Sequence, residues 1–306
     1  GIIADDVGLR LRIPATNLAG SPCAELGYII TWRKFMPDEI FCQTELNYVN
    51  AHGIEPKDVT IFNGRMSTNP KGWERRGFEL MTHHSNVLNW DDDDEVANLY
   101  YGEMTSLAKT LSGCTHALMD GHINRNPQQA LAHQDYAPIQ FVHSDFTESY
   151  GNSICEYYES VEDGPRNALE RAKVGPEAIR AATRILILQF WRNVGEPRMD
   201  LPLALCEAES VSREELQDFH VSSYAGGDFG FDTFGVKAPQ SRDQHRWFAF
   251  PEMSDQEVLT LRTYDSERAA LRKPFWTPHS AFRDPNVSAG NPARKSIEVR
   301  ATCVFE

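Results

Sequence analysis

The sequence predicts a mainly β fold in which a β-core is wrapped by flanking helices. Many short segments rich in β-branched and aromatic residues fill the second half of the chain, whereas helical patterns lie mostly earlier. No internal repeat, low-complexity tract or convincing linker interrupts the 306 residues. We therefore expect one domain that spans residues 1–306.

The elements follow from local patterns. Strands are expected at 28–32 and 59–62, where β-branched and aromatic residues gather. A helix is expected from Glu95 to Thr110, because the acidic run 91–94 complements the dipole of a helix start and Gly113 ends the pattern. A second helical pattern covers 165–184. The remaining expected elements are a short helix with a capping box at 212–216 and strands at 139–142, 185–191, 201–206, 246–250, 258–264 and 296–305.

Composition excludes several classes of partner. The net charge is −14 and no long basic run is present, which argues against nucleic acid. The longest apolar runs, such as 185–188, are too short to span a bilayer, and no signal peptide is visible at the start. The six cysteines lack a Cys-x-x-Cys spacing, so we expect reduced thiols and a cytoplasmic location rather than a zinc knuckle. The sequence is compatible with an oligomer.

Two His-x-Asp pairs occur, whereas roughly 0.7 such pairs are expected by chance in a chain with ten histidines. His133 and Asp135 follow a polar segment. His143 and Asp145 follow the apolar segment 139–142, and side chains two apart on a strand share one face. Because a ligand pair needs a rigid element, we predict that His143 and Asp145 bind a metal and that His133 does not.

A third ligand is expected at His279, which follows Pro278 and lies fifteen residues before Arg294. The other histidines have no partner at ligand spacing and are expected to be surface or core residues. Two imidazoles and one carboxylate form the facial triad of non-haem Fe(II) oxygenases, which leaves open positions for a cosubstrate and O2.

Such oxygenases use a cosubstrate whose far carboxylate meets an arginine, because the guanidinium fork matches a carboxylate. Arg294 and Ser296 share one face of the expected last strand and are the first choice for this clamp. Arg300 lies on the same face, two pleats further along, and competes with them. The alternative for Arg294 is a surface residue that precedes the strand.

Several ordered motifs resemble those of a known family. The chain resembles the fungal and bacterial group that includes gibberellin-desaturase-like proteins and the accessory component of cephalosporin 7α-methoxylation. The resemblance covers residues 59–306, with 1–58 as a variable N-terminal part. Its markers lie at 142–147, 190–192, 201–208, 250–253, 264–266, 278–282 and 294–300. The chain departs from the family pattern at Gln189 and Phe190, where an Asn is expected before the Trp-Arg pair.

The resemblance implies a double-stranded β-helix (a jelly roll, cupin-like) that carries an Fe(II)/2-oxoglutarate-dependent dioxygenase. It implies iron held by His143, Asp145 and His279 and 2-oxoglutarate held by an Arg-x-Ser pair. The substrate is expected to be a small molecule of secondary metabolism, including an amino acid, that is hydroxylated, desaturated or cyclised after C–H abstraction.

Substrate contacts are expected at Trp191 and Arg192. Arg192 binds a substrate carboxylate in one interpretation and forms a buried ion pair with an acid near Glu207 in the other. Two rival functions remain at this point: a zinc hydrolase that uses the same ligands, and a catalytically silent accessory or binding protein on the same fold.

Overall fold

The structure is a computed structural model that describes residues 38–306 except 68–71, 161, 223, 225–229 and 289. The described residues belong to one compact unit. The strand expected at 28–32 lies outside them, as does most of the variable N-terminal part.

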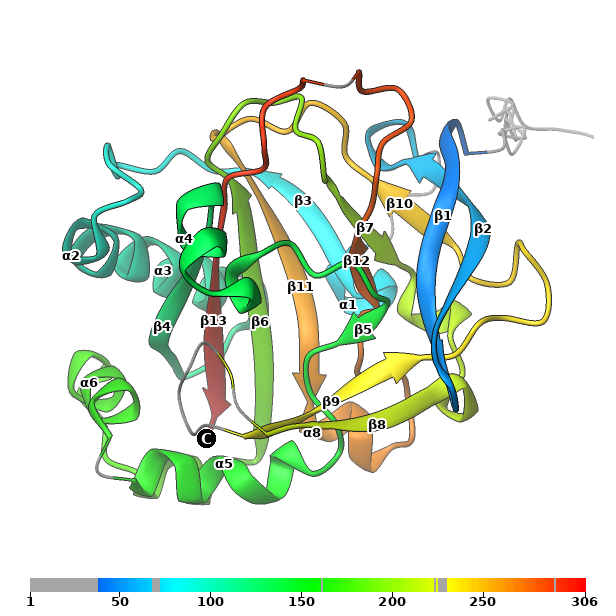
Figure 1. Ribbon diagram of the computed structural model, residues 1–306. Helices are drawn as coiled ribbons and strands as arrows, with labels where there is room; N and C mark the ends of the chain where they lie inside the picture. Colours follow the sequence, from blue (N-terminus) through cyan, green and yellow to red (C-terminus); the bar gives the residue numbers. More distant parts are fainter. Residues whose placement is uncertain (1–37, 68–71, 161, 223, 225–229, 289) are drawn as a thin grey trace, which may run out of the picture. The chain divides into compact units, whose positions relative to one another are not determined.

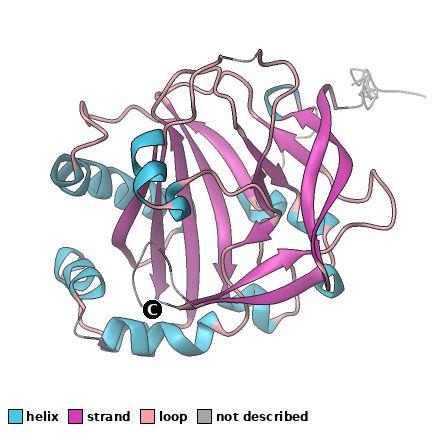
Figure 2. Ribbon diagram, viewed as in Figure 1, coloured by secondary structure: helices cyan, strands magenta, loops and turns pink. Residues whose placement is uncertain are grey.

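Two β-sheets form the core of this unit (Figures 1 and 2). One sheet has eight strands in the order β1-β2-β10-β7-β12-β5-β9-β8, and the other has five in the order β3-β11-β6-β13-β4. The strands of the eight-stranded sheet are β1 Ile40–Asn50, β2 Gly53–Asn63, β5 His143–Ser144, β7 Leu203–Cys206, β8 Leu216–Val221, β9 Phe231–Val236, β10 Trp247–Ala249 and β12 His279–Ala281. Those of the five-stranded sheet are β3 Phe78–Thr82, β4 His116–Arg125, β6 Arg184–Asn193, β11 Glu257–Asp265 and β13 Ser296–Phe305.

Helices flank the sheets and connect their strands. The α-helices are α1 Trp73–Arg76, α2 Asp93–Glu95, α3 Tyr101–Ser112, α4 Pro127–Ala132, α5 Tyr150–Glu159, α6 Asp163–Ala172, α7 Glu177–Ala181 and α8 Ser266–Ala270. A π-helical turn, η2 Val96–Tyr100, joins α2 to α3. Short 3₁₀ turns are η1 Gly64–Met66, η3 Gln134–Tyr136, η4 Ala208–Ser210 and η5 Arg213–Glu215.

The helix expected at 95–110 is confirmed as the continuous run α2–η2–α3. The Asp92 side chain caps its start by accepting hydrogen bonds from the main-chain N–H groups of Asp94 and Glu95. Gly113 ends it with φ of 71°, a left-handed conformation that glycine adopts without a Cβ penalty. The second expected helix is instead two helices, α6 and α7, because Lys173 adopts a left-handed conformation between them.

The two faces of the five-stranded sheet have different neighbours. On β6, Leu188 and Phe190 pack with α3, on the outer face. Trp191 packs on the opposite face with Leu205 and Phe248 of the eight-stranded sheet, so this face lines the interior between the sheets. Because strand side chains alternate, Gln189 shares the interior face with Trp191.

Asp120, on β4, accepts hydrogen bonds from the Tyr158 hydroxyl at 2.8 Å on Oδ1 and 3.0 Å on Oδ2. Burial raises the pKa of Asp120 to about 6 in spite of these bonds. A carboxyl group whose pKa is higher in the folded than in the unfolded state stabilises the fold at low pH. That contribution is lost as the pH rises through the folded-state pKa.

We therefore expect the free energy of unfolding of the wild-type protein to fall, relative to that of Asp120→Asn, as the pH rises from about 4 to about 6. The loss is at most about 3 kcal/mol, at about 1.4 kcal/mol per pH unit between the two pKa values. Urea unfolding of both proteins from pH 4.5 to pH 8 measures this difference. The amide carbonyl of the variant keeps an acceptor for the Tyr158 hydroxyl, and parallel stability curves would contradict the assignment.

Candidate metal centre

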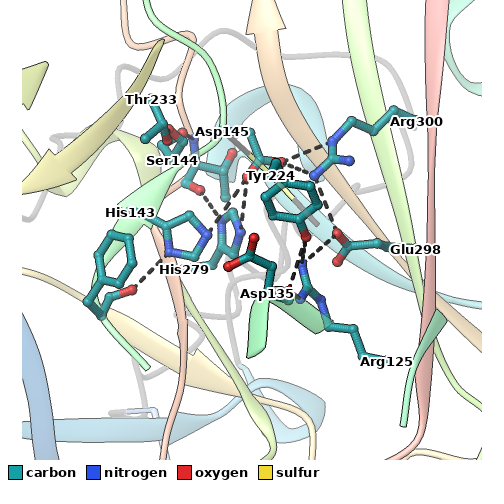
Figure 3. A network of polar contacts seen from close by, with 12 residues as sticks. Arg125, Asp135, His143, Ser144, Asp145, Tyr224, Thr233, His279, Glu298 and Arg300 are labelled. Carbon is teal, nitrogen blue, oxygen red and sulfur yellow. Dashed lines mark hydrogen bonds and ion pairs between the residues drawn. The ribbon is translucent and has the colours of Figure 1, made fainter. Parts of the chain in front are cut away.

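The three predicted metal ligands converge in the interior. His143 on β5 and His279 on β12 are direct partners in the antiparallel register of these strands, and Asp145 follows β5 (Figure 3). One ligand atom from each of the three residues lies within 4.8 Å of the others. In the part of the chain that the structure describes, this is the one set of three such residues.

The short strand β5 orients its side chains by alternation. His143 and Asp145 face the interior, whereas the Ser144 side chain between them points to the opposite face of the strand. Thr233 donates a hydrogen bond to the Ser144 carbonyl at 2.8 Å, and the Thr277 N–H donates to its hydroxyl at 3.2 Å. These bonds fix the strand, and with it the two neighbouring side chains.

Each histidine is oriented by the carbonyl two residues before it. His143 Nδ1 lies 2.8 Å from the Phe141 carbonyl oxygen, and His279 Nδ1 lies 3.0 Å from that of Thr277. A carbonyl only accepts, so Nδ1 carries the proton and Nε2 keeps its lone pair. The two Nε2 atoms lie 3.8 Å and 3.6 Å from Oδ1 of Asp145.

Protonation states also suit a metal. Burial and the neighbouring His279 lower the pKa of His143 to about 3, so its imidazole is neutral at neutral pH. Burial opposes ionisation of Asp145, but Arg300 and the two histidines outweigh it and hold its pKa below the usual range. The neutral His143 imidazole beside the ionised Asp145 carboxylate provides donor atoms that suit a divalent transition metal.

Arg300 lies against the carboxylate ligand. Its Nη2 and Nε donate to Oδ2 of Asp145 at 3.0 Å and 3.3 Å, which leaves Oδ1 facing the histidines. Nη2 also lies 3.4 Å from Oε1 of Glu298. Burial opposes the charge on Arg300, but Asp145 and Glu298 raise its pKa above the usual value.

Arg294 has a different environment. Its side chain is buried, and its Nε has no hydrogen-bond partner within the described residues. Nη1 donates to the Leu201 carbonyl at 3.2 Å, and the guanidinium lies 5.5 Å from the centre of the Trp191 ring. No carboxylate of the described residues pairs with it, and burial together with Arg125 lowers its pKa to about 9. A buried guanidinium without an acid partner fits a carboxylate ligand.

Two further polar atoms on the interior face of β6 lack partners. Within the described residues, Nε1 of Trp191 and Oε1 of Gln189 are buried and make no hydrogen bond. Ser296 is buried at the start of β13, on the interior face with Glu298 and Arg300. The interior therefore holds unused hydrogen-bonding groups between the two sheets.

The predicted position of Arg192 needs correction. It lies on the outer face of β6, opposite to Trp191, and donates to the Tyr100 hydroxyl and to the main-chain carbonyls of His83 and Asp255. It neither faces the interior nor pairs with Glu207, whose carboxylate bonds Arg76. Through these hydrogen bonds Arg192 connects the loops that contain His83 and Asp255 to the outer face of the sheet.

The predicted strand at 139–142 is also corrected. Only an isolated bridge between Phe141 and Asn47 is formed there, and the strand itself is His143–Ser144. The other His-x-Asp pair lies in and beside η3, where His133 and Asp135 contact each other at 3.4 Å without a third ligand.

Three residues next to the centre were not predicted from the sequence: Arg125, Glu298 and Tyr224. Arg125 on β4 donates to the Tyr224 hydroxyl at 3.1 Å, to Oε1 of Glu298 at 3.3 Å and to two main-chain carbonyls of the segment before β5. Glu298 shares the strand alternation of Ser296 and Arg300, and this signal was available. Arg125 reaches the network only through the pairing of β4 with β13.

A family model described as "Oxidoreductase/YMDC permease-like domain" matches residues 33–305. The chain belongs to this family. Among the described helices, none has the length and apolar character needed to cross a bilayer.

Several curated proteins are similar to this chain over most of its length. "Hydroxylase/desaturase CTB9" of Cercospora beticola is 26% identical over 269 residues, which cover 82% of this chain and 78% of that protein. "Hydroxylase/desaturase efuI" of Hormonema carpetanum is 27% identical over 284 residues, 86% of each chain. "Fe(II)/2-oxoglutarate-dependent dioxygenase nvfI" of Aspergillus novofumigatus is 25% identical over 244 residues, 74% of this chain and 78% of that protein.

A solved structure shows the same fold. The chain superposes on "iron and alpha-ketoglutarate-dependent endoperoxidase NvfI" with a TM-score of 0.66 and 19% identity, over 86% of this chain and 98% of that one. The predicted jelly roll is confirmed, and so is the predicted resemblance to fungal oxygenases of secondary metabolism. At the level of the family, the expected enzyme class and its cofactors, Fe(II), 2-oxoglutarate and O2, are confirmed.

Proposed function

We propose that this chain is a non-haem Fe(II)/2-oxoglutarate-dependent oxygenase that acts on a small molecule of secondary metabolism. The observation that carries the proposal is the convergence of His143, Asp145 and His279 to within 4.8 Å in a buried interior. Fe(II) with 2-oxoglutarate and O2 supplies the oxidising power for hydrogen abstraction from a C–H bond.

In this proposal each residue has a defined task. His143 and His279 offer Nε2 lone pairs because their Nδ1 atoms are bound to carbonyls. Asp145 offers Oδ1 while Arg300 holds Oδ2, which fixes the carboxylate in one orientation. Arg294 and Ser296 bind the far carboxylate of 2-oxoglutarate. Arg294 is favoured over Arg300 for this carboxylate because Nε and Nη2 of Arg300 already bond Asp145 and Glu298, so Arg300 has only Nη1 left and cannot grip a carboxylate with two parallel bonds.

The pocket walls would control which C–H bond is presented. Trp191 faces the interior and lies against Arg294, and its Nε1–H has no hydrogen-bond partner among the described residues. We propose that it contacts the cosubstrate or the substrate. Hydroxylation, desaturation and cyclisation share the hydrogen-abstraction step and differ in how the substrate is held afterwards.

Anaerobic addition of Fe(II) and 2-oxoglutarate to the purified protein tests the function. We expect a weak visible charge-transfer band that needs both components, and succinate formation once O2 and a substrate are admitted. Succinate in place of 2-oxoglutarate is the control and should give no band. A protein that gives no band and forms no succinate with any tested substrate would be an accessory protein instead. Hydrolysis supported by Zn(II) without 2-oxoglutarate would indicate the hydrolase.

We also propose a cytoplasmic location. The support is chemical, since Cys42, Cys114, Cys155, Cys206 and Cys303 are all free thiols. Fluorescence microscopy of a tagged chain in its source cells tests this, and a signal confined to a secretory compartment would contradict it.

A further inference from the structure

Arg300 presents an unused hydrogen-bond donor next to the proposed metal ligand. Its Nε and Nη2 are bonded to Asp145 and Glu298, but Nη1 has no partner within the described residues (Figure 3). Of its side chain 30% is accessible, against 11% for Asp145 and 7% for His143. The Arg300 side chain is therefore the most accessible of these three side chains.

Arg300 shares both of its acid partners with other groups. Arg300 and Arg125 both bond the same oxygen, Oε1 of Glu298, so two guanidinium groups share one carboxylate. Asp145 is the second acid in contact with Arg300, but a carboxylate that binds a divalent cation shares its charge with that cation. The nearby Asp135 carboxylate contacts His133 at 3.4 Å. The two guanidinium groups and the two carboxylates in contact balance in charge, so an anion at Arg300 would be favoured when a divalent cation takes up the charge of Asp145.

Gln189 adds a complementary group. It is the direct partner of Arg300 in the β6–β13 register, so the two side chains are neighbours on the interior face. Gln189 is buried, and its Oε1 has no hydrogen-bond partner within the described residues. A buried acceptor without a donor costs free energy, and a ligand that brings an N–H or O–H group removes that cost.

From this juxtaposition we infer that the substrate is a small organic acid with an amino or hydroxyl group close to its carboxylate. Arg300 Nη1 binds the carboxylate, and Gln189 accepts a hydrogen bond from the neighbouring donor group. The Phe146 ring, 6.0 Å from the Arg300 guanidinium, offers an apolar surface to the remainder of the molecule. 2-Oxoglutarate does not meet this requirement, because it carries carboxylates and a ketone but no donor group. The inference rests on the proposed function, since it assigns Arg294 to the cosubstrate.

The test uses the full chain loaded anaerobically with Co(II) and 2-oxoglutarate. The probes are the twenty protein L-amino acids and the corresponding L-2-hydroxy acids, and binding is read from the change in the Co(II) absorption spectrum. We expect at least one of these acids to bind. Its α-carboxamide should bind about 10- to 100-fold more weakly, because a charge-assisted hydrogen bond is lost.

Variants separate the two contacts. Arg300→Gln should weaken the responding acid by about 10- to 100-fold more than it weakens 2-oxoglutarate. Co(II) is kept at saturation in this comparison, because Arg300 also holds the Asp145 carboxylate. Gln189→Leu should weaken that acid but not the analogue that lacks its amino or hydroxyl group. Arg198→Gln is the matched control, because this exposed arginine pairs only with Glu252 within the described residues, and its binding should match the wild type.

Four outcomes would overturn the inference. The first is a carboxamide that binds as well as its acid, and the second is a Co(II)·2-oxoglutarate complex to which no probe binds; both leave the proposed function intact. The third is loss of 2-oxoglutarate binding in Arg300→Gln but not in an Arg294 variant, which would make Arg300 the cosubstrate clamp. The fourth is failure of the Co(II)·2-oxoglutarate complex to form, which would remove the proposed function as well.

Discussion

Replacing His143 or His279 by alanine is expected to weaken Fe(II) binding by more than about 100-fold, since losing even a group that supports a ligand costs 10- to 100-fold. Each variant leaves two ligands, and among the described residues no other His, Cys, Asp or Glu joins this set. Titration with Co(II) or Fe(II) under argon measures the affinity directly. The visible band with 2-oxoglutarate should disappear together with metal binding.

His133→Ala is the matched control for this experiment. His133 belongs to the same His-x-Asp pattern but lies in a more exposed position beside η3, without a third ligand. It should bind metal like the wild type, and circular dichroism should show that all three variants are folded. A His133 variant that loses the metal while the His143 variant keeps it would refute the ligand assignment.

Replacing Arg294 by methionine is expected to weaken 2-oxoglutarate binding on the order of 100- to 1000-fold, while metal affinity stays unchanged. Truncating one partner of a buried charge pair typically costs about 2–5 kcal/mol, and this guanidinium is buried with an unused Nε. Arg294→Lys keeps the charge but loses the planar fork, so its affinity should lie between those of the wild type and the methionine variant. Calorimetric titration of the Zn(II)-loaded protein with 2-oxoglutarate measures these affinities.

Arg294→Met weakens ligand binding, but without 2-oxoglutarate it should not lower the stability of the fold. A buried guanidinium that lacks an acid partner destabilises the fold, so Arg294→Met should be at least as stable as the wild type when no 2-oxoglutarate is present. Addition of 2-oxoglutarate to the Zn(II)-loaded proteins should then raise the melting temperature of the wild type but not that of the variant. A variant that is strongly destabilised alone and still binds 2-oxoglutarate would show that Arg294 has a structural role only.

Local patterns predicted the long elements well. The strands β6, β11 and β13 are long apolar segments, and the helix α2–η2–α3 carries both a cap and a glycine stop, so neighbouring residues alone specify them. The two-residue strand β5 could not be predicted from its own residues. It exists because β9 and β12 pair with it on both sides, and the sequence does not show which strands become neighbours.

The error at Arg192 has a simpler cause. Trp191 and Arg192 are adjacent on a strand, so they must face opposite sides of the sheet, and only one of them can reach the interior. Trp191 packs between the sheets, whereas Arg192 bonds Tyr100 on the outer face. The period of two was visible in the sequence, but which side would be the interior was decided by the helices that cover the other face.

The sequence by itself determined the chemistry of the proposed centre: two imidazoles, one carboxylate and two arginines within residues 294–300. These are properties of residue type and short spacing. Only the tertiary structure brought His279 beside His143, joined Arg125 to Glu298 and paired Arg300 with Asp145. It also left Arg294 without an acid partner among the described residues. The physical reason is that burial of the whole core sets strand register and sheet order. Neither of two distant segments therefore specifies by itself that the two will be in contact.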